Sequence, residues 1–307
     1  MIWISDLYTQ EQVAGWSWLI AIFLWLAGIA GMGSVAYYWY RRASLAITLL
    51  ISIILALIFV VSDLTRPWNV PNAIFSALLT GTYNWFSWMA LGIVLLVIQL
   101  ILLLVISYRH LVGDKIKWLR WLSSMASSNI FVGIVSLFGF LVTIYSGFLI
   151  SQASGIPLWN TPLIPVLWLV SASICAVALV EILWLLETKE HDERLLGVTR
   201  IGFSIDLFEL FVVLTFIYVS LTVGTLGTVL GAERIYRGEL APITWIGVIG
   251  LGITYPALVG IYTLATKKHN KALIISAAVL ALLGALLLRY IILVAGVYEP
   301  ISQSAFS

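Results

Sequence analysis

Residues 145–165, YSGFLISQASGIPLWNTPLIP, form a short polar interruption in a very apolar chain. The segment contains no Asp, Glu, Lys or Arg, and an apolar run of more than 20 residues stands on each side of it. An α-helix needs about 20 apolar residues to cross the hydrocarbon core of a bilayer. The segment therefore predicts a loop between two transmembrane helices, and it places the chain among helical membrane proteins.

The composition of the whole chain supports this class. Hydrophobic residues make up 62% of the 307 residues and charged residues only 10%, whereas a soluble domain carries about 25% charged residues. A β-barrel is not expected, because its strands alternate over about ten residues. The single cysteine, Cys175, excludes an internal disulfide, and no Cys-x-x-Cys motif offers a zinc or iron–sulfur site.

We expect an all-α polytopic membrane protein, a single integral membrane domain over residues 1–307, with eight transmembrane helices arranged as two four-helix bundles. We expect the first span to be a retained helix rather than a signal peptide, because no Lys or Arg precedes it. The eight spans are expected near residues 16–40, 44–63, 83–108, 128–151, 161–187, 200–224, 243–266 and 271–297.

The basic residues orient these spans. Twelve of the 16 Lys and Arg residues fall in or beside the connections 1–2, 3–4, 5–6 and 7–8, which the positive-inside rule assigns to the cytoplasmic side. Both termini, and the loop between spans 4 and 5, are therefore expected outside. The twelve are Arg41, Arg42, Arg109, Lys115, Lys117, Arg120, Lys189, Arg194, Arg200, Lys267, Lys268 and Lys271.

A short motif occurs twice on the expected outer face. WNVP at residues 68–71 and WNTP at residues 159–162 each precede an expected span on that face, which hints at two related halves. An Asn cap followed by Pro in the first turn favours a helix start. We therefore expect Asn160 to cap span 5 and Trp159 to lie at the membrane interface as an aromatic anchor.

Two classes of chemistry are not supported by the sequence. The histidines His110, His191 and His269 all fall in inner connections, whereas a transmembrane b-type haem needs axial histidines within the bilayer. No Walker loop is present, so the sequence does not support ATP-driven transport.

Four ionisable residues fall inside the expected spans, where charge is costly and commonly functional. Glu181 lies in span 5, Asp206 and Glu209 lie in span 6, and Arg289 lies in span 8. The i,i+3 spacing puts Asp206 and Glu209 on one helix face. Protonatable carboxylates at such positions suit proton transfer. The alternative is a structural role, in which Arg289 pairs with a carboxylate or extends towards the membrane surface.

These groups divide by depth. At 1.5 Å per residue, Tyr145 lies about 9 Å and Arg289 about 12 Å below the outer ends of their spans. The three acids lie in the inner half and the middle. This division fits a small redox molecule that docks from outside above protonatable groups, although interfacial packing alone also accounts for Tyr145.

Four segments carry a resemblance to a known family: WSWLIAIFLWLAGIAGMGS, IYSGFLISQASGIPLWNTPLIPVLWLVSA, IDLFEL and LLRYIILVAG. Together they resemble the NrfD-like membrane-anchor subunits of polysulfide reductase, which have eight spans and bind quinone. The second segment is the most specific match. The resemblance touches spans 1, 4, 5, 6 and 8.

The resemblance implies the site and its ligand. The family's quinone-contacting tyrosine falls on Tyr145, whereas its first-helix Asn and His fall on Ser17 and Ile20, which do not match. A menaquinone-like or other low-potential quinone is implied, with no haem, iron–sulfur cluster or metal in this chain. The implied quinone-binding residues are Ser17, Trp18, Tyr145, Trp159, Asn160 and Arg289, and those for proton transfer are Glu181, Asp206 and Glu209.

The resemblance also implies partners. We expect a multi-pass subunit of a bacterial or archaeal plasma membrane, embedded in lipid and without a nucleic-acid partner. It would oxidise quinol near the outer face and pass electrons to a ferredoxin-like iron–sulfur subunit, which serves a molybdopterin catalytic subunit. Sulfur or polysulfide is the first expected acceptor, followed by tetrathionate, thiosulfate or dimethyl sulfoxide. Two alternatives stay open: a proton-coupled solute transporter, and the membrane subunit of a quinol-oxidising complex that reduces cytochromes.

Overall fold

The structure is a computed structural model, and it describes residues 13–16, 18–187, 193–267 and 270–299. Eight helical segments in this part of the chain are long and apolar enough to cross a membrane, which confirms the expected number. They are α1 (Trp18–Tyr37), α2 (Ala43–Ser62), α4 (Trp88–Leu111), α6 (Asn129–Ser151), α7 (Leu163–Glu187), α8 (Glu193–Thr222), η4 with α10 (Ile243–Thr254 and Tyr255–Thr266) and α11 (Lys271–Ala295).

Three further helices lie in the connections: α3 (Asn69–Leu79), α5 (Arg120–Ser127) and α9 (Leu226–Tyr236). Short 3₁₀ turns at Gly113–Lys115 and Lys117–Leu119 precede α5. The WNVP motif precedes the third span, as expected, but a short helix intervenes. Its Asn69 begins the 11-residue helix α3, which is too short to cross, and the next long helix begins only at Trp88.

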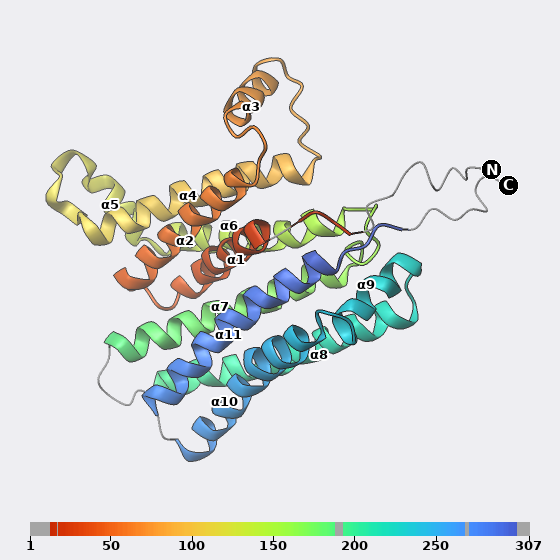
Figure 1. Ribbon diagram of the computed structural model, residues 1–307. Helices are drawn as coiled ribbons and strands as arrows, with labels where there is room; N and C mark the ends of the chain where they lie inside the picture. The colour runs from red at the N-terminus through yellow and green to blue at the C-terminus, as the bar shows by residue number, and fades with distance from the viewer. Residues whose placement is uncertain (1–12, 17, 188–192, 268–269, 300–307) are drawn as a thin grey trace, which may run out of the picture.

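The long helices form two packed sets (Figure 1). In the N-terminal set, α1 packs on α2 and α6, and α4 lies against α2 and α6. In the C-terminal set, α7 lies between α8 and α11, while η4 and α10 pack on both α8 and α11. The sets meet where α1 and α6 contact α7 and where α1 contacts α11.

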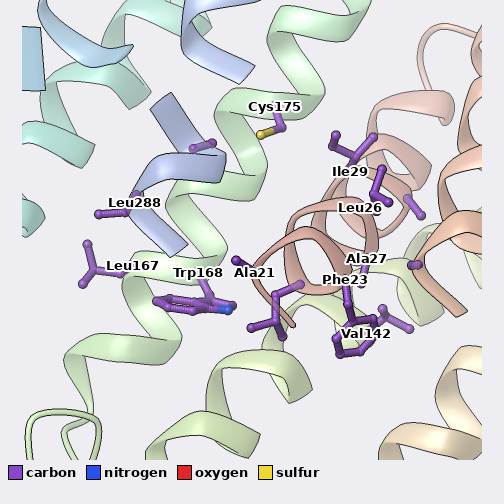
Figure 2. Packing of buried hydrophobic residues seen from close by; sticks show 14 of the residues in the cluster. Ala21, Phe23, Leu26, Ala27, Ile29, Val142, Leu167, Trp168, Cys175 and Leu288 are labelled. Atoms are coloured by element: carbon purple, nitrogen blue, oxygen red, sulfur yellow. The ribbon is translucent and has the colours of Figure 1, made fainter. Parts of the chain in front are cut away.

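Helix α1 is central to this arrangement because it is apolar on every face. Ala21 and Ala27 are fully buried, and Phe23 is only 2% exposed. Figure 2 shows these side chains between Val142 of α6 and Trp168 of α7. Small residues let neighbouring membrane helices approach closely, so α1 joins the two sets.

The seventh span is wound in two ways. Residues Ile243–Thr254 form a π-helix, and α10 continues it from Tyr255. Gly252 of the π-helical turns lies directly on Gly284 of α11, and a Cβ atom on either glycine would overlap the other backbone. The crossing therefore requires glycine at both positions.

The two ends of the bundle differ in charge. One end, which we call the basic end, carries the connections that contain Arg41, Arg120 and Lys271. The other, called the opposite end, carries α3, α9 and the loop from α6 to α7. There the Ala14 N–H donates to the Gly296 carbonyl at 2.9 Å, and Val13 and Val297 form an isolated β-bridge.

Candidate functional site

Tyr145 lies in the half of α6 nearer the opposite end and is only 4% exposed. Its phenol ring covers Gly92 of α4, and any side chain at that position would overlap the ring. Within the described residues, its hydroxyl has no hydrogen-bond partner. A phenol can donate one hydrogen bond and accept others, so this hydroxyl is available to a ligand.

Aromatic side chains close the region between Tyr145 and the opposite end. Trp88 of α4 stacks on Phe148 of α6 with ring centroids 4.8 Å apart and an interplanar angle of 13°. Tyr83 donates its hydroxyl to the Ala90 carbonyl at 2.7 Å, which holds the segment before α4 against that helix. Tyr145 thus lies between α4 and α6, and the segment that follows α3 is bound to α4 at Ala90.

Arg289 occupies a different position, at the junction of the two helix sets. Its side chain is 1% exposed. Nη1 donates to Ser171 Oγ and to the Ala285 carbonyl, both at 2.9 Å, and Nη2 lies 3.5 Å from the Trp168 carbonyl. A Cβ atom on Gly28 of α1 would lie 3.0 Å from Nη2. The guanidinium therefore faces protein on several sides, and extension towards the membrane surface is not what the structure shows.

Arg289 also interacts electrostatically with Glu209, which is 3% exposed. No ion pair shorter than 4.0 Å joins them among the described residues. Ser171 lies beside both groups, because it accepts a hydrogen bond from Arg289 and also interacts with Glu209. The arginine and this acid therefore belong to one buried polar cluster between α7, α8 and α11.

The other two acids line a small cavity in the C-terminal set. Thr199 donates its hydroxyl to Glu181 Oε1 at 2.7 Å. Asp206 is 5% exposed, and its Oδ1 has no partner within the described residues. The cavity has a volume of about 30 Å³, and Glu181, Thr199 and Asp206 share its wall with Thr263. That volume is enough for a water molecule.

The remaining expected site residues lie near the opposite end. Trp18 is 43% exposed and stacks on Tyr290, with ring centroids 3.7 Å apart. Asn160 is exposed, and the Leu163 N–H lies 3.4 Å from Thr161 Oγ1 rather than bonding to Asn160. The expected Asn160 cap is therefore wrong. Ser17 lies outside the described residues.

Trp159 was expected to be an anchor at the membrane surface, and this is also wrong. Its side chain is 1% exposed and its indole N–H donates to the Ile292 carbonyl of α11 at 2.7 Å. Its ring lies 5.2 Å from that of Trp16 and covers Gly296. Trp159 thus joins the α6–α7 loop to the end of α11.

The expected site residues therefore form three separate groups. Tyr145 lies with α4, Arg289 and Glu209 lie with Ser171, and Glu181 lies with Asp206 at the cavity. The three acids are close enough to interact, since Asp206 interacts electrostatically with both glutamates. No described contact joins Tyr145 to Arg289.

Several residues that contact these three groups were not predicted from the sequence: Gly28, Gly92, Ser171 and Thr199. Small and hydroxylic residues are common in membrane helices, so nothing in their own positions marks them. Thr199 follows Glu181 by 18 residues and lies on the next helix, so no helical periodicity in the sequence predicts that the two are in contact. Among the described residues, no group of three His, Cys, Asp or Glu side chains could hold a metal ion.

Comparison with known proteins gives consistent matches over nearly the whole chain. The family model described as polysulphide reductase, NrfD matches residues 7–300. Protein NrfD of Escherichia coli is 29% identical over 92% of this chain and 94% of its own length. The C subunit of polysulfide reductase from Wolinella succinogenes is 29% identical over 94% and 96%. A NrfD homolog of Haemophilus influenzae is 24% identical over 92% and 94%.

Proposed function

Because the chain belongs to the polysulphide reductase NrfD family, we propose that it is the membrane anchor subunit of a respiratory reductase complex. The single observation that carries the proposal is the match over residues 7–300 to that family. The eight long apolar helices support a multi-pass location. The terminal reduction is assigned to other subunits, because the described chain is almost entirely membrane helices and short connections.

Quinol oxidation is assigned to the region of Tyr145. The hydroxyl of the buried Tyr145, which has no partner among the described residues and lies against Gly92, fits a ring oxygen of a quinol. Bound quinol supplies two electrons and two protons. Tyr145 orients the head group by a hydrogen bond, and the stacked Trp88 and Phe148 limit water access from the opposite end. The ligand is proposed to enter from the lipid beside α1 and α6.

The partners are assigned to the opposite end of the bundle. The charge difference between the ends supports a cytoplasmic basic end and an outer opposite end in a bacterial or archaeal plasma membrane. A ferredoxin-like iron–sulfur subunit would cover the outer loops and serve a molybdopterin catalytic subunit. Sulfur or polysulfide is the proposed acceptor class, which the name of the Wolinella relative favours.

Proton movement is assigned to the C-terminal set. Glu181, Asp206 and Glu209 interact with one another through Asp206, and the cavity between the first two has room for water. Carboxyl groups joined by water can pass protons along such a row. The buried guanidinium of Arg289 lies where the row meets the N-terminal set.

The test of the quinol site is Tyr145→Phe in the whole complex. Removing the hydroxyl while keeping the ring should reduce quinol-linked turnover about tenfold, which corresponds to the roughly 1.4 kcal/mol expected for one lost hydrogen bond. Turnover with a soluble electron donor should be unchanged. The matched control is Tyr218→Phe, because Tyr218 is 68% exposed on α8. Full quinol turnover in Tyr145→Phe would reject this site.

The second candidate function is a proton-coupled transporter, which the cavity lined by Glu181 and Asp206 favours. Purification from native membranes separates the two. Iron–sulfur and molybdopterin subunits bound to the chain support the anchor, whereas a solitary chain that moves protons with a solute supports the transporter. Copurification with cytochromes instead would indicate the third candidate, the membrane subunit of a cytochrome-reducing complex.

A further inference from the structure

Helix α3 is the part of the described fold that packing does not explain. It lies within residues 64–87, which we call the α3 hairpin, between the ends of α2 and α4. No other described helix packs along α3. In Figure 1 it lies to the side of α2 and α4, and not beyond the end of the bundle.

The exposed side chains of the hairpin are large and apolar. Trp68, Phe75, Leu79 and Phe86 are between 65% and 97% exposed. Isolated apolar residues are normal on a protein surface, but a group of this size on one short segment marks contact with another apolar phase.

Beyond Arg66, near its start, the hairpin also lacks charge. Between Arg66 and Arg109 there is no Asp, Glu, Lys or Arg. The membrane helix α4 accounts for the second half of this stretch, from Trp88 onward. Residues 67–87 have the same lack of charge without crossing the membrane. A loop that stood in water between two spans would have no reason to exclude charged residues.

The short segments that connect α3 to its neighbours limit where the helix can lie. Six residues separate Ser62 at the end of α2 from Asn69 at the start of α3. Extended chain spans at most about 3.5 Å per residue, so α3 begins within about 25 Å of the end of α2. Both ends of the hairpin are thus held at the level where two membrane-crossing helices begin and end.

We propose that the α3 hairpin lies in the lipid leaflet at the opposite end of the bundle, with its aromatic side chains between the headgroups and the upper acyl chains. Its partner is a lipid surface. The hairpin continues the lipid-facing surface of α2, where Ile58 is 54% exposed. Tyr83 ties its return segment to α4 through the Ala90 carbonyl. Contact with lipid is independent of the quinol chemistry.

A protein partner is the competing occupant, and the placement argues against it. A subunit that covers the end of the bundle would approach along the helix axes, whereas α3 lies beside the bundle (Figure 1). Aromatic residues with uncharged polar neighbours such as Asn72 and Asn84 are typical of the membrane interface.

Nitroxide labels test the proposal in vesicles of phosphatidylcholine and phosphatidylglycerol. Phe75→Cys and Leu79→Cys report on α3 at two independent positions. Ile58→Cys is the lipid reference, and Glu233→Cys, at an exposed position in α9, is the water reference. Cys175 is fully buried, so the unsubstituted chain serves as the labelling blank.

The expected result is that both α3 labels relax more strongly with oxygen than with a water-soluble nickel chelate, as Ile58→Cys does. Accessibility to the chelate equal to that of Glu233→Cys would overturn the proposal. A loss of chelate accessibility that occurs only when the other subunits of the complex bind would also overturn it and would assign α3 to a protein interface. Agreement between two exposed positions excludes a local effect of one substitution.

Discussion

At the scale of single residues, the buried guanidinium of Arg289 is bound by neutral groups, while its Nε has no hydrogen-bond partner among the described residues. Arg289 is held by Ser171 and by the carbonyls of Ala285 and Trp168. A buried charge is costly unless such groups satisfy it. The sequence could place Arg289 in a span, but not its partners, because those belong to another helix and to the backbone.

Trp159 gives a residue-scale prediction. Trp159→Phe removes the indole donor from the Ile292 carbonyl and leaves a small gap beside Gly296. We expect a loss of about 1–2 kcal/mol in unfolding free energy, the usual cost of one buried hydrogen bond. Thermal denaturation in detergent should show a lower midpoint.

The matched control is Trp85→Phe. Trp85 is 56% exposed, and no hydrogen bond of its indole is found among the described residues, so its substitution should leave the midpoint nearly unchanged. Equal midpoints for both variants would show that the Trp159 bond contributes nothing measurable. Trp159 could not be told from an interfacial tryptophan by sequence, because both occur where a span meets a loop.

At the scale of elements, the eight spans were predictable because length and absence of charge determine them. The boundaries were less so: α4 begins at Trp88 rather than near 83, and α8 begins at Glu193 rather than near 200. Charged residues do not prevent a helix from extending beyond the length that a bilayer requires, and α8 has 30 residues with Glu193 in its first turn. Helix α3 was not predicted, because its apolar segment is short and lies so close to the third span that hydropathy does not separate the two.

The η4–α11 crossing supports a prediction on two glycines. Gly284→Val should destabilise the protein by about 1–3 kcal/mol, because the new side chain would overlap Gly252 and separate the helices. Gly197→Ala on exposed α8 should instead stabilise it by up to about 1 kcal/mol, since alanine favours helix and nothing lies within 4 Å. If the thermal midpoints of both variants shifted in the same direction, the close contact of Gly252 with Gly284 would be contradicted.

The acids of α7 and α8 support a prediction on proton movement. Asp206→Asn and Glu181→Gln should each slow proton movement coupled to turnover in vesicles, because an amide cannot pass on a proton as a carboxyl does. Glu193→Gln, at an exposed position in the first turn of α8, is the control. Unchanged proton movement in both variants would leave these acids with a structural role.

At the scale of the whole molecule, the orientation of the bundle can be measured directly. Arg237→Cys marks the opposite end and Arg120→Cys the basic end, each by its place in a connection. In intact cells an impermeant thiol reagent should label only Arg237→Cys, and lysis should expose both. The reverse pattern would reject the orientation that the basic residues favour.

How the helices pack was beyond prediction from sequence. The spans of a membrane protein share one composition, so hydropathy contains little information on which pairs touch. The contacts that position Tyr145 and Arg289 depend on Gly92 and Gly28, which look like any other helical glycine. The sequence therefore identified candidate site residues by chemical type, whereas only the structure showed which of them lie together in three groups.

The position of Gly28 against Arg289 has a consequence for how this protein can change. Gly28 belongs to the first transmembrane helix and Arg289 to the last, yet a Cβ atom at position 28 would lie 3.0 Å from the guanidinium. Substitutions at contacting positions are not additive. A substitution at Gly28 is therefore expected to change the effect of a substitution at Arg289, so a chimera of this chain and a relative should keep the two residues together.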